Sequence, residues 1–277
     1  MLAPSTIRSV NWHLISACNY SCRFCFARNL GETPVSFSEG ERILTRLADA
    51  GMEKINFAGG EPLLHPRLFD YCRAAHDLGM TVSITTNGSR LTPEQVRMER
   101  GYIDWIALSV DSASEETEVR LGRGDGRHVG HCIRLSDAIR EAGIRLKINT
   151  TVTALSREED MTGFIRRTDP DRWKVLQMLH IRGENDGAVA DLSVTDAEFR
   201  AFADRHTGVV LRGGVLPVFE SSAMIEGSYF MVTPGGRVKT DTGRVIRKYS
   251  LDEVLESGVS AYVDEGQYLG RGGVYAW

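Results

Sequence analysis

The chain has 277 residues, of which 42% are hydrophobic, and it carries a formal net charge of −4 at pH 7. A chain of this length can bury one large core, so one domain of barrel size is predicted rather than two. The negative charge provides no overall attraction to nucleic acid or to a membrane surface. No stretch reaches the roughly 20 apolar residues of a membrane span, and residues 1–6 resemble neither a signal peptide nor an amphipathic anchor. We therefore expect a protein that binds neither nucleic acid nor membranes. Cysteines that are expected to be reduced indicate the cytoplasm.

Strand-like apolar runs alternate with amphipathic segments along most of the chain. Several runs are apolar on both faces, as the strands of a covered parallel sheet are. The predicted strands are residues 9–15, 54–58, 81–85, 105–110, 145–151 and 174–181. Six β–α repeats in sequence predict an α/β fold in which a parallel sheet curves into a partial (β/α)6 barrel.

Helix starts are predicted at four capping motifs, in which a hydroxyl residue is followed three positions later by Glu or Gln. The capping residues are Ser36, Thr92, Ser156 and Thr195. After residue 183 the alternation weakens, and turns are predicted at residues 233–236 and 241–243. We therefore predict a barrel over residues 1–182 and a C-terminal extension over residues 183–277 that packs on it within the same domain. The basic hairpin 237–248 is expected to be a solvated surface.

Three of the five cysteines lie close together with the spacing C-x3-C-x2-C, and they are Cys18, Cys22 and Cys25. This spacing suits a 4Fe–4S cluster with one open iron, whereas iron–sulfur electron carriers usually supply four cysteines. A structural zinc site needs four ligands, and only His13 lies close enough to be the fourth. A disulfide framework is typical of small secreted domains. The cysteines alone leave zinc and chance spacing open, and Cys72 and Cys132 are predicted to be buried thiols.

A turn of two glycines, a glutamate and a proline follows the second predicted strand. Glycine lets the backbone approach a ligand closely. One β–α unit after the cysteine motif, this turn resembles that of the radical S-adenosylmethionine superfamily. The resemblance implies that the open iron binds the amino and carboxylate groups of S-adenosylmethionine and that the turn binds its ammonium. The implied cofactor-binding residues are Gly59, Gly60, Glu61, Asn87, Ser109 and Asp111, although the last three could be polar strand exits.

Segments along nearly the whole chain are similar to viperins in their prokaryotic form. They include residues 10–13, 53–57, 121–126, 147–149, 172–175, 183–185 and 271–275. The resemblance implies a lyase that converts a ribonucleoside triphosphate (CTP, UTP or GTP) into its 3′-deoxy-3′,4′-didehydro analogue, an antiviral chain terminator. It implies a 4Fe–4S cluster and S-adenosylmethionine as cofactors, a 5′-deoxyadenosyl radical, and a reductase, flavodoxin or ferredoxin as electron donor. CTP and UTP are favoured over GTP.

Two pairs of polar residues are predicted to face the barrel interior. Lys147 and Asn149 are two positions apart and share a face of one strand, and Arg172 and Lys174 repeat this arrangement. Buried charges without partners are costly, so an anionic ligand is indicated, although solvent-facing charges at strand ends are the alternative. Arg123, in a glycine-rich turn, adds a guanidinium suited to phosphate.

The viperin resemblance places these side chains at the triphosphate, with Asn11 and Lys54 near the ribose and phosphates. Tyr229 is a candidate donor of an electron and a proton, because a phenol can give a hydrogen atom. Simple packing of its ring is the alternative. The chain departs from the family at Ala58, where serine is frequent, and at Ser222, where asparagine is common. Segment 220–222 is expected to face the nucleobase, so base preference depends on it.

Two other functions are compatible with these motifs. One is another single-cluster radical enzyme that acts on a nucleotide, and the other is a non-catalytic iron–sulfur or nucleotide sensor. Cyclases of molybdopterin synthesis and peptide-modifying relatives carry further cysteine clusters, and no cysteine follows Cys132 here. The dehydratase is therefore the predicted function.

Overall fold

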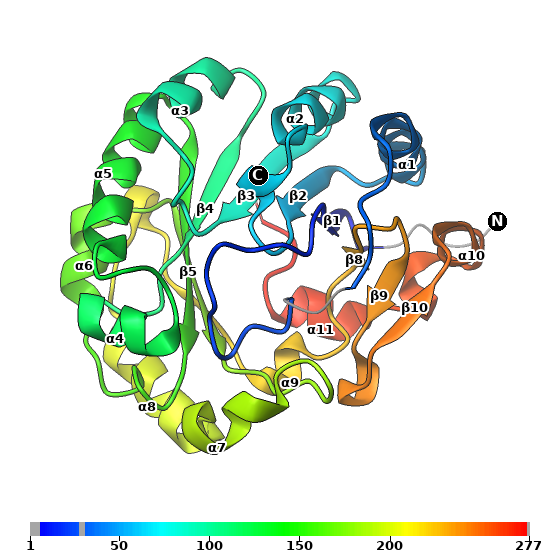
Figure 1. Cartoon of the computed structure of the whole chain (residues 1–277). Helices are drawn as coiled ribbons and strands as arrows, with labels where there is room; N and C mark the ends of the chain where they lie inside the picture. The colour runs from blue at the N-terminus through cyan, green and yellow to red at the C-terminus, as the bar shows by residue number, and fades with distance from the viewer. Residues whose placement is uncertain (1–5, 28–30, 276–277) are drawn as a thin grey trace.

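A curved sheet, covered on its outer face by helices, forms most of the structure (Figure 1). The computed structural model describes residues 6–27 and 31–275, so residues 1–5 of the segment searched for a signal peptide lie outside the described residues. Six strands alternate with helices in the predicted order, which confirms the α/β partial barrel. The order is β1 (Ser9–His13), α1 (Phe37–Asp49), β2 (Lys54–Ala58), α2 (Leu68–Asp77), β3 (Thr81–Thr86), α3 (Pro93–Glu99), β4 (Trp105–Ser109), α4 (Glu115–Leu121), α5 (His128–Glu141), β5 (Arg145–Val152), α6 (Thr162–Thr168) and β6 (Arg172–Gln177).

The residues after position 182 extend the same sheet at both edges. β7 (Val218–Glu220) pairs in parallel with β6, and β8 (Met231–Val232) pairs in parallel with β1. β9 (Val238–Thr240) and β10 (Arg247–Tyr249) follow antiparallel, and the turns predicted before each of them are confirmed. The strand order is β10-β9-β8-β1-β2-β3-β4-β5-β6-β7.

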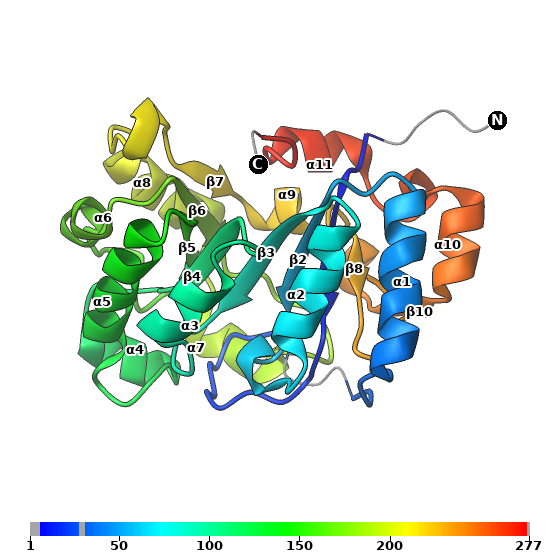
Figure 2. The same cartoon turned by 90° about the horizontal axis from the view of Figure 1, so that it is seen from above.

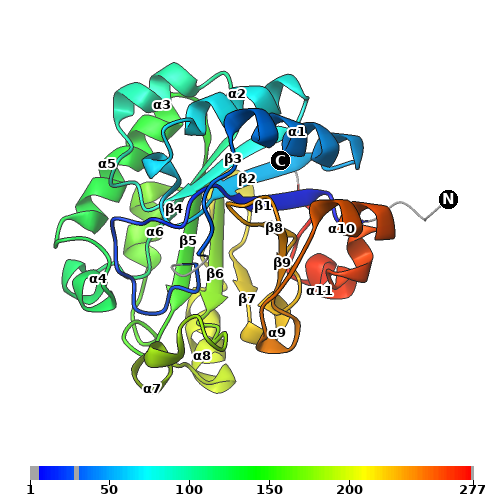
Figure 3. The same ribbon diagram turned by 45° about the vertical axis from the view of Figure 1, so that its right-hand side comes forward.

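Short helices complete this C-terminal part of the chain. They are α7 (Val189–Leu192), α8 (Asp196–His206), α9 (Ser222–Ile225), α10 (Leu251–Ser257) and α11 (Glu265–Gly270). Figure 2 shows α1, α2, α3 and α5 on one side of the sheet and α11 on the other, and Figure 3 shows α10 and α11 beside β9. None of the helices in the described part of the chain is long and apolar enough to cross a membrane.

The predicted strand 174–181 is wrong at both ends, because β6 spans Arg172–Gln177. Beyond Gln177 the chain leaves the sheet, and Leu179 and Ile181 pack against Ile225 in a separate apolar cluster. The alternation that predicted a strand there reflects this cluster. β1 also ends earlier than predicted, at His13.

Three of the four predicted helix starts are confirmed, because each hydroxyl accepts the backbone N–H three residues later. These capping residues are Ser36, Thr92 and Thr195.

Ser156 is wrong as a helix start, since α6 begins only at Thr162. The hydroxyl of Ser156 accepts the N–H of Thr153 at 3.2 Å instead. The carboxylate of Glu159, which the capping motif requires, accepts the hydroxyl of Ser112 at 2.6 Å. A tertiary partner has therefore replaced the local cap.

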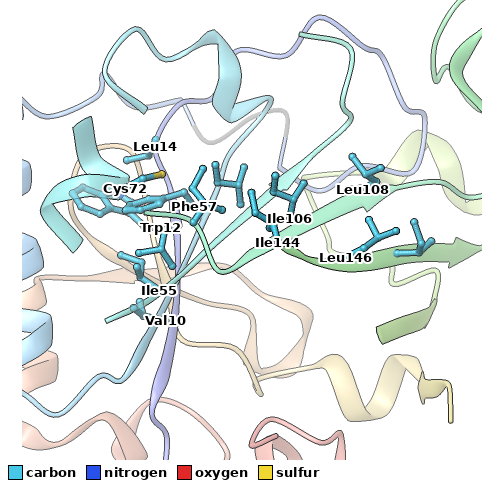
Figure 4. Close-up of a cluster of buried hydrophobic side chains, with 14 of the residues drawn as sticks. Val10, Trp12, Leu14, Ile55, Phe57, Cys72, Ile106, Leu108, Ile144 and Leu146 are labelled. Carbon is cyan, nitrogen blue, oxygen red and sulfur yellow. The ribbon is translucent and has the colours of Figure 1, made fainter. Parts of the chain in front are cut away.

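Alternate residues of the strands divide between a hydrocarbon core and the barrel interior. Val10, Trp12 and Phe57 belong to the hydrocarbon core on the side of the sheet that the helices cover (Figure 4). The Trp12 ring lies 5.3 Å from that of Tyr71 on α2. The opposite face of β1 and β5 points into the barrel. Along β5, fully buried residues alternate with partly exposed ones, and the partly exposed ones lie on this inward face. The polar residues of the predicted site therefore belong to the inward face of the sheet.

Candidate active site

The loop that follows β1 carries the three clustered cysteines to the carboxyl ends of the strands. All three line one cavity, and they are Cys18, Cys22 and Cys25. Two backbone hydrogen bonds hold this loop to the end of α4. The N–H of Ser21 donates to the carbonyl of Gly122 at 3.0 Å, and the N–H of Arg23 donates to that of Leu121 at 2.9 Å. The chain itself therefore fixes the loop beside the cavity.

Amide N–H groups point at two of the three sulfur atoms. The N–H of Tyr20 donates to Sγ of Cys18, and the N–H of Ala27 donates to Sγ of Cys25, both at 3.4 Å. The side-chain amide of Asn87 donates to Sγ of Cys18 at 3.9 Å. Hydrogen bonds to the sulfur ligands are one way in which proteins tune iron–sulfur clusters. This set of sulfurs and donors fits a 4Fe–4S cluster.

The zinc alternative finds no matching set of ligands. Within residues 6–27 and 31–275, no three His, Cys, Asp or Glu side chains converge on a point that could hold a metal ion. A zinc site requires such convergence, because four ligands surround one ion at about 2.0–2.3 Å. The cysteines of a cubane bind different irons, so a cubane does not require this convergence on one point.

The two glycines after β2 are required by the cysteine loop that packs against them. The N–H of Gly60 donates to the carbonyl of Ile15 at 2.6 Å. A Cβ atom on Gly59 would lie 2.5 Å from the carbonyl oxygen of Ile15, and one on Gly60 would lie 2.2 Å from that of Ala17. Both glycines line the cavity. Their lack of side chains therefore lets two backbones meet at the place where the resemblance expects the methionine end of S-adenosylmethionine.

Glu61 serves a different purpose from the predicted ligand contact. Its buried carboxylate accepts the hydroxyl of Thr86 at 2.6 Å and the N–H groups of Asn87 and Leu63 at 2.8 and 3.1 Å. These bonds join the exits of β2 and β3. The structure does not bring the Glu61 side chain to the cavity wall, so the turn presents its glycine backbone there.

Of the remaining predicted cofactor residues, Asn87, Ser109 and Asp111 all line the cavity. Asp111 accepts the N–H of Thr151 at 2.8 Å and forms an ion pair with Arg123 at 2.7 Å. Glu118 lies 3.5 Å from the same guanidinium. Arg123 therefore stands beside Asp111 and the cysteine loop, and it lines the same cavity as the lysines described next. Its contact with a triphosphate stays a prediction.

Two lysines project from the middle of the sheet into the same cavity. They are Lys147 on β5 and Lys174 on β6. Burial lowers the pKa of Lys147 well below its usual value, and nearby cations lower this pKa further; they belong to Lys174, Lys54 and Arg172. No hydrogen bond or ion pair joins Lys147 to another residue in the described part of the chain. Lys147 therefore becomes charged only at a cost unless an anion is bound beside it, which indicates that an anion completes this site.

Lys54 and Arg172 stand at the amino ends of β2 and β6, where the last described residues cover them. The ring of Tyr275 lies 4.3 Å from Nζ of Lys54 and 3.8 Å from the guanidinium carbon of Arg172. Arg172 also donates to the carbonyl of Gly272 at 3.0 Å. Neither cation lines the main cavity, although both influence Lys147 electrostatically.

The two predicted asparagines face the cavity from two different strands of the sheet. Asn11 on β1 accepts the side-chain amide of Asn56 at 2.9 Å. Asn149 on β5 lies beside Lys174 in the strand register, and its buried Oδ1 has no hydrogen-bond partner among the described residues. This oxygen is free to accept a hydroxyl from a ligand.

Tyr229 contacts Lys174 and a carboxylate, that of Glu220, which was not predicted to lie there. Its hydroxyl accepts from Nζ of Lys174 at 2.9 Å and donates to Oε2 of Glu220 at 2.6 Å. Glu220 also forms a 2.5 Å ion pair with Lys174. The neighbouring N–H of Ser222 donates to Gln177 at 2.8 Å, so contact of this segment with the nucleobase stays a prediction.

Sequence reasoning did not name Arg271 or Tyr275 as site residues, and it expected Glu220 at the nucleobase rather than beside Lys174. Arg271 and Tyr275 belong to a segment that matched viperins, and a cation and an aromatic ring near the C-terminus were the available signal. For Glu220 the signal was indirect, because buried lysines need a counter-charge but do not say which acid provides it.

Comparison with known proteins agrees with this geometry. The model of the Radical SAM superfamily matches residues 12–168. An S-adenosylmethionine-dependent nucleotide dehydratase of Lacinutrix mariniflava is 40% identical in an alignment that covers 99% of this chain and 60% of that protein. One from a Thermoplasmatales archaeon is 37% identical over 98% of this chain and 96% of its own length. The crystal structure of Streptococcus suis SuiB bound to S-adenosylmethionine has a TM-score of 0.71 at 18% identity, covers 96% of this chain and 68% of its own, and shows the shared fold.

The first of these relatives is longer than this chain, which spans 60% of it, whereas the second is matched over nearly its whole length. The chain therefore belongs to the radical S-adenosylmethionine superfamily and, within it, to the S-adenosylmethionine-dependent nucleotide dehydratases, the viperins.

Proposed function

We propose that this chain is a lyase that removes water from the ribose of a ribonucleoside triphosphate and yields the 3′-deoxy-3′,4′-didehydro nucleotide, an antiviral chain terminator. The observation that carries the proposal is one cavity lined both by the three cysteines and by the interior lysines, Lys147 and Lys174. Such a cavity can hold a radical source and a polyphosphate side by side. The printed name of the relatives, nucleotide dehydratase, supports the same reaction class.

Each part of the cavity has a separate task in this reaction. Cys18, Cys22 and Cys25 would hold a 4Fe–4S cluster, which together with S-adenosylmethionine would supply a carbon radical able to take a hydrogen atom from the ribose. The glycine backbone after β2 lies against the cysteine loop, where it can approach the methionine. Lys147 holds phosphate oxygens, and the free oxygen of Asn149 accepts a ribose hydroxyl.

After the ribose loses a hydrogen atom at C4′, the 3′-hydroxyl leaves as water and the product needs one further electron. Tyr229 lines the cavity and is the proposed source of that electron. A reductase, flavodoxin or ferredoxin is the proposed external donor, and the reducing cytoplasm is the proposed location. CTP and UTP are the proposed substrates ahead of GTP.

The reaction is tested with CTP that carries deuterium at C4′. Anaerobic incubation with the cluster-loaded protein, S-adenosylmethionine and dithionite should move the deuterium into 5′-deoxyadenosine, and the nucleotide should lose the mass of water. Mass spectrometry of both products measures this. Label that stays in a nucleotide of unchanged mass would indicate an isomerase, and the absence of 5′-deoxyadenosine would indicate a sensor.

Triphosphate binding should draw protons into the site at neutral pH. Burial lowers the pKa of Lys174, which lines the cavity, to about 8, so part of this amine is neutral at pH 8 in the free protein. A bound anion favours the charged form, and affinity should therefore rise as the pH falls from 8 toward 6. Calorimetry in two buffers of different ionisation enthalpy measures the proton uptake. An affinity independent of pH would show that the phosphates do not approach this amine.

A further inference from the structure

The carboxylate of Glu220 occupies an unexpected place for a site that binds phosphate. Its residue ends β7 and is completely buried. It lies 2.5 Å from Nζ of Lys174, and its other oxygen accepts the hydroxyl of Tyr229 at 2.6 Å. A buried negative charge repels the anion that Lys174 is expected to hold. A purely electrostatic clamp would be stronger without it, so Glu220 requires another explanation.

The hydrogen bonds around Tyr229 indicate what this carboxylate does. The phenol hydrogen is directed at Glu220, while the phenol oxygen accepts from Lys174 at 2.9 Å. The guanidinium carbon of Arg271 lies 3.6 Å from the centre of the Tyr229 ring, and its Nη2 donates to the carbonyl of Ser228 at 2.9 Å. The ring is therefore fixed on three sides, and its proton faces an acceptor within the protein.

The protonation states agree with this arrangement. Burial raises the pKa of Tyr229 well above its usual value, so the phenol keeps its proton until it is oxidised. Burial lowers the pKa of Lys174 to about 8, with Glu220 opposing the shift, so the amine is mostly charged at pH 7 and can give up a proton readily.

We propose that Glu220 is a positioning residue for the dehydration, which orients the Tyr229 hydroxyl and receives its proton when the ring gives up an electron. This inference rests on the proposed function. It assigns to Glu220 a role in the chemical step, whereas the sequence placed this segment at the nucleobase.

The Tyr229 O–H bond breaks, its electron goes to the ribose radical that has lost the 3′-hydroxyl, and its proton goes to the Glu220 carboxylate. The departing hydroxide takes a proton from the Lys174 ammonium and leaves as water. The new carboxylic acid on Glu220 then returns a proton to the Lys174 amine across their 2.5 Å contact. A one-electron iron–sulfur or flavin carrier, together with one proton from solvent, restores the tyrosine.

The test measures the yield of dehydrated nucleotide per molecule of 5′-deoxyadenosine in the cluster-loaded full chain with CTP and dithionite. Glu220→Gln should lower this yield at least tenfold while S-adenosylmethionine cleavage continues and the KM for CTP changes less than threefold. Tyr229→Phe should lower the yield similarly, and the double variant should show no further loss, because both residues serve one step. Glu220→Asp should restore part of the yield.

Glu184→Gln is the matched control. Glu184 is a mostly buried carboxylate 3.2 Å from Nζ of Lys239, and it does not line the cavity, so its variant should keep the parental yield. Three results would each overturn the inference. The first is a Glu220→Gln enzyme that keeps the parental yield of dehydrated nucleotide per 5′-deoxyadenosine, and the second is a variant in which only the KM for CTP changes. The third is a double variant whose yield falls by the product of the two single losses. If Glu220→Gln does not fold, the inference is judged on Glu220→Asp, whose yield of dehydrated nucleotide should lie between those of Tyr229→Phe and the parent protein. A parent protein that forms no dehydrated nucleotide overturns the proposed function and this inference together.

Discussion

Replacing Cys22 with alanine should abolish both the absorbance of the 4Fe–4S cluster and the cleavage of S-adenosylmethionine. The three sulfurs of the loop after β1 line one cavity, and the described residues offer no converging group of ligands that could take over. A cubane with two protein thiolates would lose its attachment on one side. We therefore expect an all-or-none effect, measured by iron content, visible absorbance and 5′-deoxyadenosine formation under reduction.

Cys132→Ala provides the control for this experiment. Cys132 is fully buried on α5 and lies 3.7 Å from the imidazole of His128, outside the cysteine loop. Its variant should load the same amount of iron as the parent protein. A full cluster in Cys22→Ala would show that the C-x3-C-x2-C spacing has been assigned to the wrong chemistry.

Replacing Lys147 with methionine should weaken the binding of nucleoside triphosphate by roughly ten- to a hundredfold, since a hydrogen bond to a charged group contributes about 1.5–3 kcal/mol. Methionine keeps much of the length of the side chain and removes only its charge. Because Lys147 has no partner in the described part of the chain, its loss leaves no protein carboxylate unpaired. The folded protein should therefore stay intact, which thermal unfolding can check.

The comparison with nucleoside monophosphate makes this experiment specific. Lys147→Met should narrow the preference for triphosphate over monophosphate, whereas a general disturbance of the cavity would weaken both ligands equally. Arg97→Met, which removes an exposed cation from the outer helix α3, should leave both affinities unchanged. A Lys147→Met protein that binds triphosphate like its parent would contradict the argument from strand faces.

The strands that carry the site could be predicted because their patterns are local. Alternation along residues 145–151 placed Lys147 and Asn149 on one face, and the structure brings both to the cavity wall. Capping at Ser36 and Thr195 depends only on residues within one turn, and it too was predictable. The cysteine spacing is local in the same sense.

Features that depend on distant partners could not be predicted in this way. Ser156 lacks its helix because Glu159 finds Ser112, which lies 47 residues earlier in the chain. Arg123 reaches the cavity wall, but its ion pair with Asp111 could not be predicted from the glycine-rich turn that carries it. Glu220 meets Lys174 only because β7 pairs with β6, and no short pattern announces that a three-residue strand will extend the sheet.

Because β7 and β8 are the two outermost parallel strands, the Glu220–Tyr229 hydrogen bond connects the two edges of the barrel. β7 pairs with β6 at one end of the parallel strands, and β8, two residues after Tyr229, pairs with β1 at the other. No strand pairing joins β7 to β8 in the described part of the chain. A 2.6 Å contact between reacting side chains therefore spans the seam where the barrel fails to close. Any motion that widens this seam to admit or release a nucleotide must break the hydrogen bond between Tyr229 and Glu220. The two edges of the barrel are therefore joined here only when both side chains are in position for the reaction.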